Sequence, residues 1–370
     1  MIKRTLALVV VGAFLASCSS QEGGTAQENL GDMKNGKALT NSALQSFTVP
    51  SGAASVTLMV NGGMSETDMD ISYLKGPDGY VYVTEPWNDA DNGGLSQKLG
   101  DSTVTLTIPN GDYSAPLSGV WEYKTGCERC QGVTEAISYK TGAGSNLNVN
   151  VILVSQPDIS SANDPNLQEV ISEFKNEYAA NGFNVADIKY WIIDSGGGAI
   201  STSDGNGNGQ FDGMDQLFNN VTPGLPDGYI NVFLVRSIGS AGILGISGGI
   251  PGPPVNGTPH SGVIVSTLGG LSGLSSADRR MQGNTMAHEM GHYYGLFHTT
   301  ERSGTSFDPI SDTAQCGKSR DSDGSGSMSA EECAGAGGDN LMFWQAPVSG
   351  LQTRLSAGQR FVLGRAANIY

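Results

Sequence analysis

The sequence predicts an α+β domain, built on a twisted mixed sheet, that follows an all-β sandwich. Two observations support this division. Between about 46 and 155, short runs of alternating or β-branched residues are separated by turn residues, a spacing typical of all-β sandwiches. Further along, strand patterns alternate with helical ones, and one helical stretch carries three of the four histidines of the chain. A chain of 370 residues can bury two cores, and we expect the boundary near 146.

The composition indicates a loop-rich, acidic protein. Hydrophobic residues make up 38% of the chain, 53 residues are glycine, and the formal net charge at pH 7 is −16. Such a charge leaves no basic face that could release counterions from a polyanion, so we expect no nucleic-acid partner, and binding to an anionic membrane surface is disfavoured. The same charge favours solubility and the binding of cations.

Residues 1–18 have the pattern of a bacterial export signal. Lys3 and Arg4 precede an apolar segment, 5–14, that is too short to span a membrane in the mature protein. The segment that follows, Leu-Ala-Ser-Cys, resembles a lipobox, which implies cleavage before Cys18 and lipidation of its thiol. An ordinary signal peptide with a chance cysteine is the alternative. We expect a lipoprotein whose partner is the membrane, anchored through Cys18 at the outer membrane or cell surface, or released outside the cell.

Residues 19–45 and 46–146 differ in character. The first are rich in Ser, Gly, Gln, Asn and Glu and nearly without aromatics, so they predict a flexible tether. The second contain turn sequences such as Pro77-Asp78-Gly79 between short apolar runs. The order of Asp68–Tyr73, a glycine-containing turn and Gly119–Tyr123 resembles the jelly-roll modules often appended to secreted bacterial proteases. The predicted strands are Ser55–Val60, Met69–Leu74, Tyr80–Thr84, Thr103–Ile108, Gly119–Tyr123 and Asn148–Val154, of which the last can also open the next domain.

The domain from 147 to 370 is predicted to begin with a strand, a helix and a second strand. Helix 165–181 follows Asp164-Pro165, a start signal, and has apolar residues at the 3.6-residue spacing of one helix face. The runs Ile188–Ile193 and Ile230–Arg236 are almost continuously apolar, which predicts strands in the interior of a sheet.

A cleft is predicted beside the last strand of this sheet. We expect Gly262–Thr267 to be the edge strand, along which an extended peptide could pair, and the Gly- and Pro-rich segment 237–259 to be a surface loop at the rim. His260 is expected to be a loop residue without a chemical role. A capped helix is predicted after Leu355.

Residues 288–298 carry the clearest chemical signal, H-E-x-x-H-x-x-G-x-x-H. On the helix predicted from Ser275 to about Gly295, His288 and His292 leave the same face one turn apart, and Gly295 lets the chain turn so that His298 becomes a third ligand. Three imidazoles suit zinc and leave a fourth position for water, which is the catalytic arrangement. Glu289 can act as general base on the zinc-bound water. A helix that carries these histidines by chance is the alternative.

This stretch resembles the active-site motif of the metzincin zinc endopeptidases. The clan is named for a methionine-containing turn beneath the metal, for which Asp339–Phe343, with Met342, is the candidate. Ser311–Cys316 and His298-Thr299 look most like the pappalysin (cytophagalysin) branch. The resemblance implies a metzincin-like sheet, active-site helix and Met-turn, and hydrolysis of peptide bonds in a protein or peptide. Several metzincins have a tyrosine two residues after the methionine, whereas Trp344 stands here and cannot ionise.

Two acidic loops match the ligand spacing of an EF-hand calcium loop, although neither has a clear helix before it. Calcium takes six to eight oxygen ligands, and a glycine at the sixth position allows the sharp turn that brings them together. Both sites would be structural, and polar loops without an ion are the alternative. The candidate ligands are Asp204, Asn206, Asn208, Asp212 and Asp215 in the first loop and Asp321, Asp323, Ser325 and Glu332 in the second.

The other four cysteines predict two disulfides. Cys127 and Cys130 form a C-x-x-C pair without a second pair or a nearby histidine, so a local disulfide is favoured over half a zinc site or a redox pair. Cys316 and Cys333 bracket the second acidic loop, and a disulfide between them would fix that loop between the zinc motif and Met342.

The motifs together predict a secreted, lipid-anchored zinc endopeptidase. One rival hypothesis is a surface lipoprotein that keeps the zinc site but does not cleave, with the β-sandwich responsible for recognition. Glu289 argues against it, because a structural zinc site needs no base beside its first ligand. Another rival is a zinc hydrolase of non-peptide bonds, which His298 and Met342 disfavour.

Overall fold

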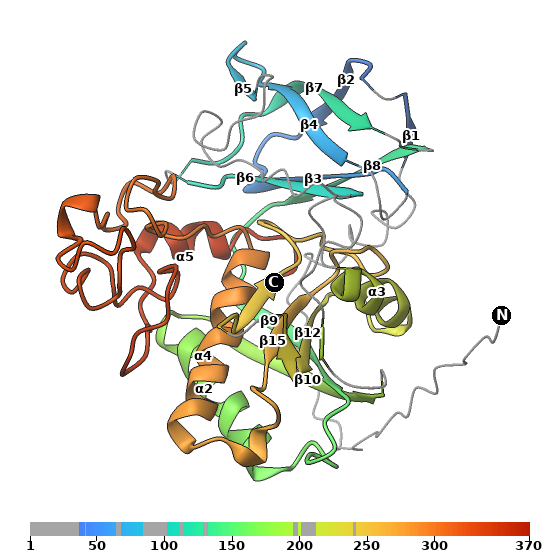
Figure 1. Cartoon of the computed structure of the whole chain (residues 1–370). Helices are drawn as coiled ribbons and strands as arrows, with labels where there is room; N and C mark the ends of the chain where they lie inside the picture. The colour runs from blue at the N-terminus through green and yellow to red at the C-terminus, as the bar shows by residue number, and fades with distance from the viewer. Residues whose placement is uncertain are drawn as a thin grey trace.

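A computed structural model describes ten segments of the chain: 37–40, 42–63, 68–83, 102–111, 114–128, 130, 132–194, 199–200, 212–239 and 242–370. The export signal with Cys18, most of the predicted tether and most of the first acidic loop lie outside these residues. Within them the protein combines several sheets with four α-helices, a mixed α+β architecture compatible with a metzincin-like domain (Figure 1).

Two four-stranded antiparallel sheets make up the N-terminal part and share one hydrophobic core, in which Trp121, Tyr123 and Met69 are buried. Because inward-facing residues alternate along the strands, each sheet contributes one apolar face to this core. The first sheet has the order β1 (Lys37–Leu39), β8 (Val133–Lys140), β3 (Ser55–Asn61) and β6 (Thr103–Ile108); the second has the order β2 (Gln45–Val49), β7 (Gly119–Glu128), β4 (Asp68–Lys75) and β5 (Val81–Val83).

A five-stranded sheet organises the C-terminal part. Its order is β10 (Asn184–Ile193), β9 (Asn146–Val154), β12 (Tyr229–Val235), β15 (Val263–Ser266) and β14 (Gly245–Ser247). The first four strands are parallel, whereas β14 is antiparallel to β15. The ambiguous run near Asn148–Val154 thus belongs to this sheet. A separate parallel pair joins β11 (Ala199–Ile200) to β13 (Ser237–Ile238).

The structure corrects two strand predictions. Strand β15 was predicted to be the edge, but it lies between β12 and β14, and the edge strand comes from the segment predicted to be a surface loop. With only three residues, β14 is too short to produce a strand pattern among glycines and prolines. Strand β10 was predicted to be interior, but it lies at the opposite edge, where its apolar residues are covered by α2 on one face.

Helices cover both faces of this sheet (Figure 1). The side chains of Val149 and Val151 belong to the core formed with α2 (Pro165–Ala180) and α4 (Ser276–Tyr293), whereas Ile152 and Val154 pack in the core that contains Phe218 of α3 (Asp212–Val221). Residues at the N-termini of three helices explain where these helices begin, because their side-chain oxygens accept hydrogen bonds from backbone N–H groups that have no partner within the helix. Asp164 caps α2, and capping boxes begin α4 and α5 (Ala357–Leu363).

The N-terminal sheets are attached to the end of the chain. The ammonium group of Lys140 on β8 donates hydrogen bonds to the carbonyl oxygens of Gly364 (2.9 Å), Ala366 (3.0 Å) and Ile369. The backbone of Tyr370 pairs in both directions with Asn146, where β9 begins. In the described part of the chain, no helix is long and apolar enough to cross a membrane.

Candidate metal centre

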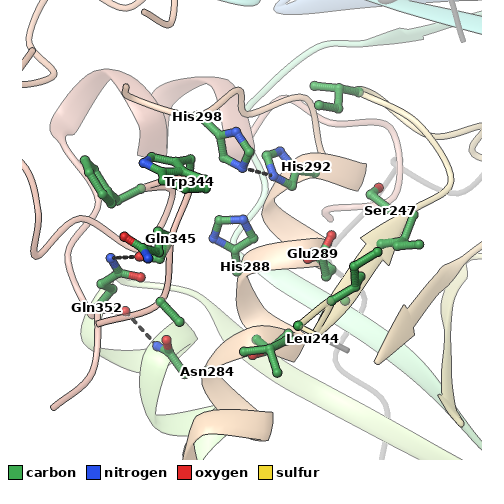
Figure 2. A pocket seen from close by; sticks show the side chains of 18 of the residues that line it. Leu244, Ser247, Asn284, His288, Glu289, His292, His298, Trp344, Gln345 and Gln352 are labelled. Carbon is green, nitrogen blue, oxygen red and sulfur yellow. Dashed lines mark hydrogen bonds between the residues drawn. The ribbon is translucent and has the colours of Figure 1, made fainter. Parts of the chain in front are cut away.

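Helix α4 and the turn after it bring the three predicted histidines together (Figure 2). His288 and His292 lie one turn apart on the helix, with ring centroids 4.7 Å apart. The chain then turns at Gly295, whose φ of 101° is accessible to glycine at little cost. His298 follows, and its Nε2 lies 3.1 Å from Nε2 of His292. One ring nitrogen from each of the three histidines lies within 4.8 Å of the others.

The opposite nitrogen of each imidazole has its own partner. Nδ1 of His288 lies 2.6 Å from the carbonyl oxygen of Leu341, and Nδ1 of His292 lies 2.7 Å from that of Leu296. Nδ1 of His298 lies 3.0 Å from Oε1 of Glu301. A carbonyl oxygen only accepts hydrogen bonds, so His288 and His292 carry their proton on Nδ1 and present an unprotonated Nε2.

The protonation of these residues suits a metal ion. Burial, followed by repulsion from His298, lowers the pKa of His288 to about 3, and the same causes hold the pKa of His292 well below its usual value. Both rings are therefore neutral at pH 7, and each presents an unprotonated Nε2 that can bind a cation. Nε2 of His298 lies 3.1 Å from that of His292. Tetrahedral zinc at about 2.0–2.1 Å from each nitrogen places such atoms about 3.3 Å apart, so the histidines fit zinc.

Glu289 lies beside the edge strand rather than among the histidines (Figure 2). Its side chain is buried, and burial raises the pKa of Glu289 to about 8, while a hydrogen bond from the backbone N–H of Ser247 opposes this. A cation held by the histidines would favour the ionised carboxylate. Gly245 of β14 passes so close that a Cβ there would lie 2.7 Å from Glu289 Oε1.

Met342 lies beneath α4 and is fully buried. A Cβ at Gly291, between the two helix histidines, would lie 2.5 Å from the Met342 sulfur, so glycine allows the helix to approach the sulfur closely. The turn around Met342 is held by a hydrogen bond of 2.8 Å from its N–H to Asn340 Oδ1 and one of 3.0 Å from Thr299 N–H to its carbonyl oxygen.

The histidines and Glu289 open into a cavity of about 650 Å³ (Figure 2). Residues 242–247, which include β14, line one side of it, and Trp344, Gln345 and Gln352 line the other. The indole N–H of Trp344 donates to the carbonyl oxygen of Met328 at 2.6 Å, so this group is engaged away from the histidines. No described residue of the N-terminal sheets lines the cavity.

The second acidic loop brings three of its four candidate residues together. One carboxylate oxygen each of Asp321, Asp323 and Glu332 lies within 4.8 Å of the others. Hydrogen bonds from Ser329 and Ser322 lower the pKa of Glu332 to about 2, so this carboxylate is ionised. The hydroxyl of Ser325 donates to the carbonyl oxygen of Ser327 at 3.1 Å.

The structure can be compared with three further predictions: the two disulfides, the first acidic loop and His260. Both predicted disulfides, Cys127–Cys130 and Cys316–Cys333, are present. Of the first acidic loop, Asp204, Asn206 and Asn208 lie outside the described residues, Asp212 begins α3, and Asp215 is buried on that helix. The loop residue His260 is also buried and does not line the cavity.

Sequence reasoning missed Gly245, Ser247 and Glu301. The first two lie in a strand that was predicted to be a loop, and a short Gly-Ile-Ser segment has no distinguishing pattern. Glu301, three residues after the last histidine, was detectable in principle, because a carboxylate often orients a metal-binding imidazole.

Comparison with known proteins agrees with this chemistry. Residues 220–345 match the Peptidase M43 family model, which is described as pregnancy-associated plasma protein-A. The matched segment contains β12, β14, β15, α4 and the three histidines, and extends through Met342 to Gln345. The match supports a metzincin-type metallopeptidase, hence a hydrolase of proteins or peptides, and implies zinc as its cofactor. No curated protein matches the chain.

Proposed function

We propose that this protein is a zinc endopeptidase, closest in its motifs to the pappalysin branch, in which His288, His292 and His298 hold the metal and Glu289 is the general base. The observation that carries the proposal is the convergence of three imidazole nitrogens beside a buried carboxyl at the floor of a cleft. A chance cluster of histidines would not require the Nδ1 partners that orient each ring.

In the proposed mechanism, zinc and the side chains of the cleft have different roles. Zinc supplies Lewis acidity, which polarises the scissile carbonyl and acidifies water. Glu289 takes a proton from the attacking water and returns it to the leaving amine. The N–H of Ser247 and the backbone of Gly245 keep the Glu289 carboxyl in one orientation. Met342 supplies an apolar floor beneath the histidines, the packing role of a Met-turn.

The substrate is a peptide bound in extended form. Strand β14 pairs with β15 on one side, and no described strand lies along its other side. An extended peptide can add there through backbone hydrogen bonds, which would carry its scissile bond past Glu289. Among the described residues no tyrosine lines the cavity. Trp344 cannot ionise, and the hydroxyl of Tyr293 donates to the carbonyl oxygen of Pro253 at 2.5 Å.

Outside the catalytic cleft, we propose that the protein is exported and anchored to a membrane by lipid on Cys18, at the outer membrane or cell surface. We also propose that calcium binds the second acidic loop through Asp321, Asp323, Ser325 and Glu332, with the Cys316–Cys333 disulfide holding the loop ends. The sequence supports a second calcium site, with Asp204, Asn206, Asn208, Asp212 and Asp215 as its candidate ligands.

Cleavage of casein by the full chain, with and without a chelator, tests the enzymatic proposal. We expect activity that the chelator removes and added zinc restores. Glu289→Ala should abolish cleavage, because no other acidic side chain among the described residues lines the cavity. Cleavage that survives in this variant would refute the role of Glu289. A zinc-loaded wild type that cleaves no protein would favour the non-cleaving lipoprotein.

A further inference from the structure

One wall of the cavity, below His288, consists of uncharged polar residues (Figure 2). Asn284 and Thr285 lie on α4, about one turn before His288, and Gln345 and Gln352 come from the segment after Met342. We call these four residues the amide wall. Since it borders the position of the first histidine, a substrate side chain next to the scissile bond can reach it.

The amide of Asn284 has a fixed orientation. Its nitrogen donates to Oε1 of Glu177 at 3.2 Å and to the carbonyl oxygen of Gln352 at 2.7 Å, which uses both of its hydrogens. The residue is only 3% exposed, so the surrounding side chains and backbone hold the amide in this orientation. Among the described residues none donates to Asn284 Oδ1. The group that Asn284 offers to a ligand is therefore a hydrogen-bond acceptor.

Gln352 has the same property. Its nitrogen donates to the carbonyl oxygens of Gly338, at 3.0 Å, and Gln345, at 2.9 Å, and no hydrogen remains for a ligand. Within the described chain, Gln352 Oε1 also receives no hydrogen bond. Two oriented amide oxygens thus belong to one wall, and Gln345 and the hydroxyl of Thr285 can supply donors beside them.

This polarity selects among substrate side chains. An apolar side chain would cover the two oxygens without replacing their hydrogen bonds to water, which is unfavourable. A cation would lose its hydration, and Glu289, the only acidic residue lining the cavity in the described part of the chain, is the proposed general base. A carboxamide offers two N–H donors to the amide oxygens and one acceptor to Thr285 or Gln345. It complements the wall without a charge.

We propose that the amide wall is a specificity subsite for a glutamine or asparagine side chain of the substrate, adjacent to the scissile bond. Asn284 and Gln352 are its specificity-determining residues, and Glu177 is a positioning residue that holds the Asn284 amide. This inference rests on the proposed function, because it assigns a preference to the same cleft.

The test begins with the peptides released from a protein mixture by the full-length, zinc-loaded wild type. We expect glutamine and asparagine to be enriched at one position beside the cleaved bond. Replacing that glutamine in a synthetic peptide with methionine, which has a similar shape but no donor, should lower kcat/KM about tenfold or more. Glutamate and lysine at this position should also lower it. Equal cleavage of the methionine peptide, or a preference for lysine, would overturn the proposal.

Two variants test whether the amide wall causes the preference for a glutamine side chain. In Gln352→Met and in Asn284→Leu, the ratio of kcat/KM between the glutamine and methionine peptides should fall toward one. Gln315→Met is the matched control, since Gln315 is exposed and does not line the cavity, and its ratio should equal that of the wild type. A ratio unchanged in both wall variants, each shown to be folded by its thermal unfolding, would contradict the assignment.

A binding measurement separates this inference from the proposed function. Zinc-loaded Glu289→Ala should bind the glutamine peptide about tenfold more tightly than the methionine peptide. If the wild type hydrolyses no peptide but this difference in affinity is found, the proposed function fails and the subsite stands. If the wild type hydrolyses peptides but both are bound equally, the subsite fails alone.

Discussion

Gly245 and Glu289 approach each other so closely that position 245 has no room for a side chain. A Cβ on Gly245 would lie 2.7 Å from Oε1 and 2.9 Å from Cδ of Glu289. The strand proposed to hold the substrate therefore contacts the proposed general base directly. Through this contact and the N–H of Ser247, the position of the carboxyl depends on the position of the edge strand.

Gly245→Ala should displace either Glu289 or β14 and lower kcat/KM on the order of 100-fold, because small misplacements of a catalytic group have effects of this size. Zinc content should stay at the wild-type level, since the three atoms nearest to a Cβ at this position all belong to Glu289 and none to a histidine. The matched control is Gly317→Ala, at a position with φ of −68° and open space for a Cβ. Full activity in Gly245→Ala would show that the contact is irrelevant to catalysis.

Glu301→Ala should lower the affinity for zinc about 10- to 100-fold, measured by competition with a chromogenic chelator. The carboxylate is the only side chain among the three Nδ1 partners of the histidines, and its removal frees His298 to change tautomer and rotate. Glu301→Gln keeps an acceptor oxygen and should retain most of the affinity.

The control for Glu301 is Glu122→Ala, which removes the same charge from a pair with Lys75 in the N-terminal sheets. Its zinc affinity should not change. Wild-type affinity in Glu301→Ala would mean that the hydrogen bond does not orient His298.

The contributions of Glu177 and Asp308 to the stability of the fold should fall as the pH rises from about 4.5 to 7. Burial raises the pKa of Glu177 to about 7, and burial also raises the pKa of Asp308 to about 7. Both acids therefore keep a proton in the folded protein that the unfolded chain has released in this range, which makes unfolding more favourable at higher pH. For Glu177 the loss amounts to about 3 kcal/mol.

Glu177→Gln tests this pH dependence, because a glutamine oxygen can still accept from Asn284 without titrating. Denaturant unfolding at several pH values should give a shallower fall of the free energy of unfolding for the variant. Parallel curves for the two proteins would contradict the assignment of this titration to Glu177.

Calcium should raise the temperature of thermal unfolding, because an ion that binds only the folded loop stabilises the folded state. Magnesium at the same concentration should act weakly, since it requires closer octahedral ligands. Asp321→Asn with Asp323→Asn should remove the calcium response, whereas Asp339→Asn, on the surface beside Arg354, should keep it. An equal response in all three proteins would exclude the second acidic loop as the calcium site.

The sequence predicted those features that depend on local periodicity. His288 and His292 lie at helical spacing, Gly295 has the turn conformation expected of it, and the strands of the five-stranded sheet, β14 excepted, are long or apolar enough to be recognised. Local rules also identified the starts of α2 and α4 and the capped start of α5, and the two disulfides followed from the number and spacing of the cysteines.

The features that were missed depend on long-range packing. The short strand β14 exists because its backbone pairs with β15 and passes over Glu289, not because Gly-Ile-Ser favours a strand. The hydrogen bond between Asn284 and Gln352 joins residues 68 positions apart, so no local pattern predicts it. The apolar sequence of β10 predicts an interior strand, because apolar strands at a sheet edge that are covered by a helix have the same sequence pattern.

The most direct test of the central claim is zinc X-ray absorption spectroscopy on the Glu289→Ala protein, together with its zinc content. We predict one zinc per chain, with three imidazole nitrogens at about 2.0–2.1 Å and no sulfur ligand. In His298→Ala the number of imidazole ligands should fall by one. A protein that binds no zinc, or a spectrum dominated by sulfur at about 2.3 Å, would contradict the metal centre on which the proposed function depends.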